Sequence, residues 1–287
     1  MNFSNLFSKR MGLSIIAGIV LFSSCKEEER LTAADTQDIS EEALMDAYFQ
    51  DIDDMGRVVL GSSSEDEFSG GRTDGTITVT DDRFTGASVT IQTSGTAENP
   101  SGTMTVDFGE GSIDNQLNVR KGKLIFTYQG WRFVPGSSVV LTTVDYSINS
   151  IELEGTRTSI NVQGSTADAP RFNVILVDGK ATFADGSVAK RESNITWEWN
   201  RAVNPFDDYL IISEESTASG TTRGGRSYQV SLQEELKYKR LCGIAVDGTK
   251  TFLIDGEKEI IIDYGNGNCD KSVSITAHGV TRNVSVN

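Results

Sequence analysis

The chain reads Asp107-Phe108-Gly109-Glu110-Gly111-Ser112-Ile113-Asp114, and a matching element, Asp263-Tyr264-Gly265-Asn266-Gly267-Asn268-Cys269-Asp270, follows at an offset of 156 residues. Each copy follows a segment in which apolar and polar residues alternate, as Met104 and Val106 do with Thr105. This alternation is typical of a strand with one buried face, and a glycine-rich turn ends such a strand. The repeat therefore predicts two related β-modules.

The composition extends this prediction to the whole chain. Glycine is abundant at 28 residues and proline is scarce at 4, while Thr, Ser, Val and Ile fill the segments between glycines. We expect a mainly β protein with two antiparallel β-meander or sandwich-like modules, at residues 72–203 and 204–287, preceded by one short amphipathic helix. The boundary falls at the Asn-Pro turn after the Trp-rich strand.

Three Asp-Gly pairs are expected to form hairpin turns, because such turns need positive φ angles. They are Asp178-Gly179, Asp247-Gly248 and Asp255-Gly256. In the Trp-rich strand, Ile195, Trp197 and Trp199 share one face. We expect that face to be core, since aromatic and β-branched residues on a strand usually pack against each other.

One amphipathic helix is predicted at residues 40–61. Ser40 is a suitable N-cap, and the apolar residues at helical spacing are Leu44, Ala47, Tyr48, Ile52 and Met55. This face is expected to pack on the first sheet, with a partner protein as the alternative. Residues 25–39 ahead of it are acidic and polar, which predicts a flexible tether.

The N-terminus has the pattern of a lipoprotein signal peptide. Lys9 and Arg10 precede an apolar run at residues 11–22 that is too short to span a membrane, and small residues lead to Cys25. We expect residues 1–24 to be removed and Cys25 to be lipidated, so that the lipid holds the protein on a membrane. The acidic residues at 27–29 resemble a tag for export to the exterior of the outer membrane.

The charge of the chain excludes some partners. The chain has 26 basic and 41 acidic residues, and residues 1–24 contain two of the basic ones, so the mature chain would carry a net charge of −17. A surface of this charge repels nucleic acid.

Cys242 and Cys269 are expected to form a disulfide in an envelope compartment, with two buried reduced thiols as the alternative. Two cysteines and the single histidine, His278, do not complete a structural zinc site.

The repeated Asp-Gly element is a candidate calcium site, because carboxylate oxygens are ligands that calcium prefers. The candidate ligands are Asp107, Glu110, Asp114, Asp263 and Asp270. The alternative is that Asp and Gly serve the tight turn itself. No other cofactor is expected.

Trp131, beside the turn at Gly130, is the candidate for stacking on a sugar ring. A catalytic site is not expected, because the chain has one His and no Gly-x-Ser-x-Gly element. Paired carboxylates for glycoside hydrolysis stay open, since their separation depends on the fold.

The series Asp107–Gly109, Arg120–Tyr128, Pro135-Gly136, Glu154–Thr158 and Ile262–Asp270 resembles uncharacterised β-rich surface lipoproteins of Bacteroidota. The resemblance covers about residues 100–287 and implies an envelope location and a β-rich build, without an activity. It also implies a cysteine in the first module's loop, where this chain has Ser112 and Ile113.

The leading hypothesis is a non-enzymatic, lipid-anchored surface lipoprotein that binds an outer-membrane protein complex or an extracellular polymer. One alternative is an accessory protein that binds or hydrolyses glycans with carboxylates and exposed aromatic residues. The other is a structural or adhesion component of the cell coat.

Overall fold

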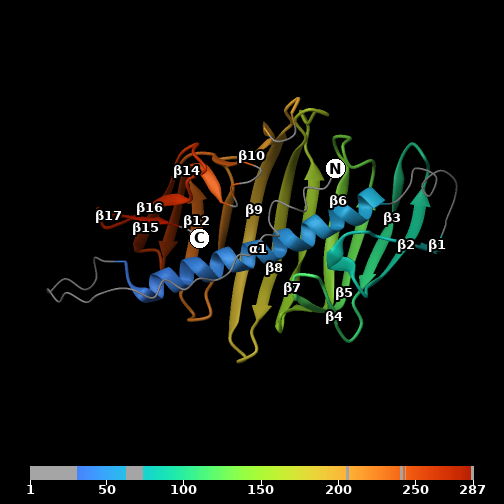
Figure 1. Ribbon diagram of the computed structural model, residues 1–287, viewed down its shortest axis with the longest axis horizontal. Coiled ribbons are helices and arrows are strands. Elements are labelled where there is room, and N and C mark those ends of the chain that lie inside the picture. The colour runs from blue at the N-terminus through green and yellow to red at the C-terminus, as the bar shows by residue number, and fades with distance from the viewer. Residues whose placement is uncertain (1–30, 63–73, 205–206, 240–241, 243, 286–287) are drawn as a thin grey trace.

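The computed structural model describes residues 31–62, 74–204, 207–239, 242 and 244–285. In this part of the chain one long helix, α1 (Ala33–Ser62), lies across one face of a wide, twisted antiparallel sheet (Figure 1). A short 3-10 helix, η3 (Asp82–Phe84), lies between the first two strands. The strands are β1 (Asp74–Thr76), β2 (Ser88–Gly95), β3 (Pro100–Asp107), β4 (Ser112–Ile113), β5 (Val119–Gln129), β6 (Ser138–Ile148), β7 (Ile151–Asn161), β8 (Arg171–Thr182), β9 (Val188–Asn200), β10 (Tyr209–Ile212), β11 (Thr217–Thr221), β12 (Ser227–Leu232), β13 (Leu236–Lys239), β14 (Ala245–Ile254), β15 (Lys258–Asn266), β16 (Ser272–Ala277) and β17 (Val280–Ser285).

The sheet is a long meander, so the predicted mainly β class with one helix ahead of it is confirmed. Strands β5 to β9 pair with their neighbours in chain order. On its other side β9 pairs with β11 along its first half and with β10 along its second half. These pairings carry the sheet past the expected boundary between the modules without a break.

The hydrophobic core is nevertheless divided into two clusters of buried residues. The larger one runs from Met45 to Ala189 in the sequence, and the smaller one from Ala218 to Ala277. The helix contributes to both, since Met45 and Phe49 lie in the larger cluster and Ile39 packs against the smaller one. Two clusters of buried residues thus lie under one shared helix, and the division into two modules stays a prediction.

The helix begins earlier than predicted. Asp35 Oδ2 accepts a hydrogen bond from Thr32 N at 2.7 Å, and Thr32 Oγ1 accepts one from Asp35 N at 3.2 Å, which satisfies two of the free N–H groups at the start of the helix. Ser40 is not the N-cap but lies inside the helix, where its hydroxyl donates to Thr36 O at 2.8 Å. The tether prediction is wrong for residues 33–39, which are helical. The remainder of the predicted tether at 25–30, the signal peptide and Cys25 lie outside the described residues.

Of the three predicted hairpin turns, only Asp255-Gly256 connects two strands, β14 and β15. Asp178-Gly179 lies inside β8 and Asp247-Gly248 inside β14, so those two predictions are wrong. Both pairs lie at shifts of strand register, and Asp178 has a φ of 54°. The positive φ that predicted a turn is used instead in a β-bulge, which bends the strand while its pairing continues.

The face of α1 that meets the sheet carries carboxylates as well as apolar residues. They form ion pairs with basic side chains on several of the strands that the helix crosses. Asp35 pairs with Lys258 of β15 and with Arg226, Glu42 with Lys250 of β14 and Arg191 of β9, Asp53 with Arg157 of β7, and Asp51 with Arg120 of β5 and Arg83 of η3. The position of α1 on the sheet is thus set by paired charges along nearly its whole length.

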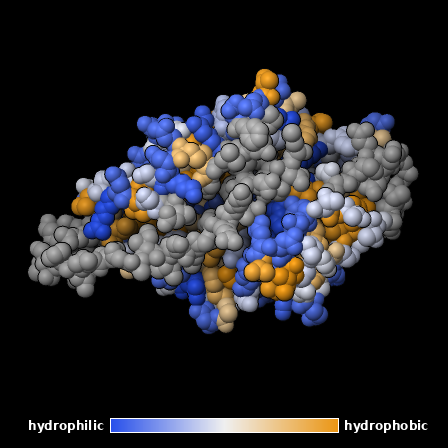
Figure 2. Space-filling view, viewed as in Figure 1, coloured by the Kyte–Doolittle hydropathy of each residue, from blue (hydrophilic) through white to orange (hydrophobic). Residues whose placement is uncertain are grey.

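With this charge content α1 is unlike a membrane span, and the described residues contain no helix long and apolar enough to cross a bilayer. On the face shown in Figure 2, hydrophobic residues form separate small groups among hydrophilic ones.

Candidate functional site

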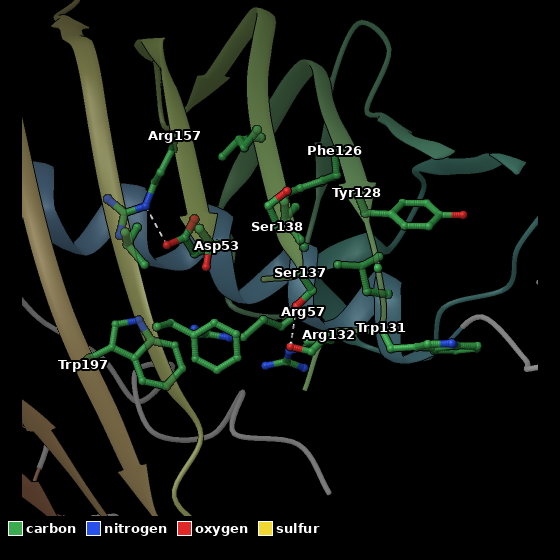
Figure 3. A pocket seen from close by; sticks show the side chains of 18 residues that line it. Asp53, Arg57, Phe126, Tyr128, Trp131, Arg132, Ser137, Ser138, Arg157 and Trp197 are labelled. Carbon is green, nitrogen blue, oxygen red and sulfur yellow. Dashed lines mark hydrogen bonds and ion pairs between the residues drawn. The ribbon is translucent and has the colours of Figure 1, made fainter. Parts of the chain in front are cut away.

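A cleft lies between the C-terminal half of α1 and strands β5 to β9 (Figure 3). Its empty space is about 860 Å³, counting the part open to solvent. The helix contributes Asp53, Gly56, Arg57 and Leu60 to its lining. Gly56 lies so close to the ring of Phe126 that a Cβ atom there would be 2.5 Å from Phe126 Cε1.

Aromatic side chains mark the two ends of the cleft. Trp197 of β9 stacks on Phe172 of β8 with ring centroids 4.8 Å apart and an interplanar angle of 25°. Trp131 lies at the other end, where its Nε1 donates to Ala97 O at 2.9 Å (Figure 3). Both tryptophans are half-buried. The cleft thus offers indole rings at both ends.

Three arginines lie between these ends, and they differ in their partners. Arg57 forms an ion pair with Asp54 at 2.9 Å. Arg157 Nε donates to Asp53 Oδ2 at 2.6 Å, while Arg157 Nη1 is buried without a hydrogen-bond partner in the described part of the chain. The third arginine, Arg132, forms no ion pair with a carboxylate there, and its guanidinium lies 4.8 Å from the ring centroid of Phe133.

The electrostatic potential of the cleft follows from this arrangement. Burial, together with the positive charges of Arg57 and Arg201, lowers the pKa of Arg132 to about 9, although the negative charge of Asp54 opposes the shift. Arg201 itself lies over Trp199, 4.2 Å from the ring centroid, and over Phe133 at 5.0 Å. The cleft is therefore a cationic site in a protein that is strongly acidic overall.

The lining of the cleft is suited to binding more than to proton transfer. Among the described residues that line it, Asp53 is the only carboxylate, and Arg157 holds it in an ion pair. Ser137 donates to Arg132 O at 3.0 Å. The described lining of this cleft contains no second carboxylate, and the alternative of paired catalytic carboxylates stays a prediction.

The structure places the two copies of the repeated element at opposite ends of the sheet (Figure 1). Their first aspartates act alike: Asp107 Oδ1 accepts from Gly109 N at 2.9 Å, and Asp263 Oδ1 accepts from Gly265 N at 2.8 Å. These bonds stabilise the turn, as the alternative interpretation of the repeat expected.

The other candidate calcium ligands differ between the copies. Asp114 is buried and accepts from Gln116 N and Asn118 N, whereas Asp270 is exposed and accepts from Ser272 N. Glu110 is exposed. Within the described ranges, no three Asp, Glu, His or Cys side chains are grouped closely enough to hold a metal ion. Calcium binding stays a prediction.

The predicted cysteine pair is present. The Sγ atoms of Cys242 and Cys269 are 2.16 Å apart, the distance of a disulfide, and 27 residues separate the two positions. The bridge links the segment after β13 to the loop after β15.

Sequence reasoning identified one end of the cleft and missed the rest. Trp131 was a candidate, but Trp197 and Trp199 were expected in the core and are half-buried instead. The arginines were not predicted, because a cation on a helix or loop is common and nothing local indicates which strands it faces. The available signal was the run Trp131-Arg132-Phe133, which places a cation between two aromatic residues.

The protein was also compared with known proteins. No family model, no curated protein and no solved structure matches this chain.

Proposed function

We propose that this protein is a lipid-anchored lipoprotein of the cell envelope that binds an extracellular polysaccharide in the cleft between α1 and β5–β9. The observation that carries the proposal is the pair of half-buried tryptophans, Trp131 and Trp197, at the two ends of one cleft. Apolar faces of sugar rings pack on indole rings, and two such rings set apart fit a chain of sugars.

Polar groups between the aromatic ends suit the same ligand. Ser138 and Ser159 line the cleft with hydroxyl groups, and the arginines supply further N–H donors. Sugar hydroxyls both donate and accept hydrogen bonds, so they match such a lining. The one carboxylate in the described lining of the cleft is held by Arg157, which favours binding without hydrolysis.

The location in this proposal rests on the sequence. The signal-peptide pattern ends at Cys25, an acidic run follows it, and the resemblance to surface lipoproteins agrees with both. A Cys25→Ala variant tests the anchor: we expect it to leave the membrane fraction. If the variant still partitions with membranes, the lipid anchor is wrong.

Binding is tested with the full-length lipidated protein, purified in mild detergent and titrated calorimetrically with a panel of neutral and acidic polysaccharides. We expect at least one polymer to bind. Trp197→Ala is expected to weaken that binding roughly threefold to tenfold, whereas Trp197→Phe retains most of it, because the ring still stacks on Phe172.

Two results would contradict this proposal. One is a panel in which no polysaccharide binds. The other is unchanged binding in both Trp131→Ala and Trp197→Ala. In either case cross-linking of whole cells, followed by mass spectrometry of stoichiometric companions, examines the remaining hypothesis of an outer-membrane protein partner.

A further inference from the structure

We infer that the polysaccharide bound by this cleft is acidic, and that its carboxylate or sulfate groups are recognised by the guanidinium groups of Arg132 and Arg157. This inference rests on the proposed function and specifies the chemical class of the ligand.

Other arginines under α1 have carboxylate partners on the helix. Arg83, Arg120 and Arg191 each meet a carboxylate of the helix within ion-pair distance. Arg132 lines the cleft with the C-terminal half of the same helix, in a chain with 41 acidic residues, yet it forms no ion pair with a described carboxylate. The negative charge of Asp54 acts on it, but Asp54 itself forms ion pairs with Arg57 and Arg83. A half-buried cation without a carboxylate in direct contact is costly, so an anion from outside would stabilise it.

Arg157 favours an anionic ligand independently of Arg132. The side chain of Arg157 is 5% exposed and lines the same cleft, and its Nη1 is buried with no acceptor among the described residues. Buried N–H groups are nearly always hydrogen-bonded in folded proteins. Asp53 accepts a hydrogen bond from Nε of this guanidinium only. A hydrogen-bond acceptor on a ligand would therefore satisfy the remaining Nη1 group.

The stacking of Arg132 on Phe133 does not replace such an anion. A guanidinium over a ring gains attraction through its flat face, while its N–H groups lie at the edge and stay available. Planar carboxylates accept two parallel N–H bonds from an arginine, and sulfate oxygens accept them as well. An acidic sugar carries such a group on the same ring that stacks on an indole.

The test compares ligands that differ only in charge. Oligogalacturonate and its fully methyl-esterified form share one backbone, as do dextran sulfate and dextran, so the two pairs distinguish a carboxylate from a sulfate. They are titrated into the full-length lipidated protein in detergent micelles. We expect at least one anionic member to bind about tenfold or more tightly than its neutral counterpart, and its affinity to fall as salt is raised.

The variant Arg132→Gln removes the charge without breaking an ion pair within the described structure. We expect it to weaken binding of the anionic polymer about tenfold and to leave the neutral counterpart unchanged. Arg282→Gln is the matched control, because Arg282 is exposed on β17, far along the sheet from the cleft, and loses the same charge. It is expected to bind like the wild type.

Failure of this inference and failure of the proposed function give different binding results. If charged and neutral polymers bind equally and Arg132→Gln has no effect, the acidic ligand is wrong while the proposed function stands. If Arg132→Gln weakens charged and neutral polymers to the same extent, Arg132 has a structural role and the inference also fails. If no polymer binds at all, the proposed function and this inference fall together.

Discussion

Glu42 on α1 and Arg191 on β9 form an ion pair in which the side chains are only 1% and 3% exposed, although 149 residues separate them in the chain. Lys250 of β14 joins the same carboxylate at 2.7 Å, and Asp46 of the helix joins the same guanidinium at 2.8 Å. This cluster of charges joins the helix to two strands near the middle of the sheet. Removing one member of such a cluster is strongly destabilising, because the remaining charges stay buried without their partner.

Replacing Glu42 by Gln is therefore expected to lower the free energy of unfolding by about 3 kcal/mol or more. The matched control is Glu215→Gln, since Glu215 pairs with Arg171 but is 64% exposed. An exposed pair of this kind contributes roughly 0–1 kcal/mol. Urea denaturation followed by circular dichroism measures both variants. Equal effects of the two substitutions would contradict the importance of the buried cluster.

The same carboxylate predicts a pH dependence of stability. Burial alone would raise the pKa of Glu42, but Lys250 and Arg191 outweigh it and lower the pKa from 4.5 to about 2. The pKa of Asp54 is also lowered, because the charges of Arg57 and Arg83 overcome its burial. A carboxyl group with a depressed pKa stabilises the fold above its unfolded pKa, and this contribution is lost as the pH falls toward the folded pKa.

We thus expect the free energy of unfolding to decline between about pH 5 and pH 2. The decline should be shallower in Glu42→Gln, which lacks one of the responsible groups. Asp38 acts in the opposite direction, because burial raises its pKa, and so it offsets a part of the decline. Denaturation midpoints measured across this range test the prediction, and a variant with the slope of the wild type would refute the assignment to Glu42.

Alanine substitutions at two glycines of α1 are expected to have opposite effects on the stability of the protein. A Cβ at Gly56 would lie 2.5 Å from the buried ring of Phe126, whereas a Cβ at Gly61 would meet nothing within 4 Å. Gly56→Ala is expected to destabilise the protein by about 1–2 kcal/mol, because overpacking exceeds the gain in helix propensity. Gly61→Ala should be neutral or stabilise by up to about 1 kcal/mol. Thermal and urea unfolding of the two variants test this prediction. A Gly56→Ala variant that is more stable than the wild type would contradict it, and would show that the helix can move away from β5.

The bridge between Cys242 and Cys269 closes a loop with a sequence separation of 27. Its removal in a Cys242→Ser, Cys269→Ser double variant is expected to cost about 3 kcal/mol, because the unfolded chain gains freedom. Intact-mass analysis after alkylation, with and without reductant, checks the bridge first. Two thiols that react freely without reductant would mean that the prediction fails.

Structural features that depend on neighbouring residues could be predicted from the sequence, whereas features that depend on distant segments could not. The Asp255-Gly256 hairpin was predicted correctly from a dipeptide, and Asp178-Gly179 was not, although the dipeptide is the same. Positive φ is a local preference, but whether it ends a strand or bends it depends on the neighbouring strands. The helix start was missed for a similar reason. The signal Thr32-x-x-Asp35 is local, but the basic partners of Asp35, Arg226 and Lys258, lie 191 and 223 residues further along the chain.

The sequence by itself determined the mainly β class, the helix ahead of it, the cysteine pair and one aromatic end of the cleft, because alternation, helical spacing and residue type express these features locally. The tertiary structure decided where α1 lies, which acid meets which base, and that Trp131, Trp197, Arg132 and Arg157 line one cleft. Those relationships depend on strand register and on packing between segments far apart in the chain, and no local pattern encodes either of them.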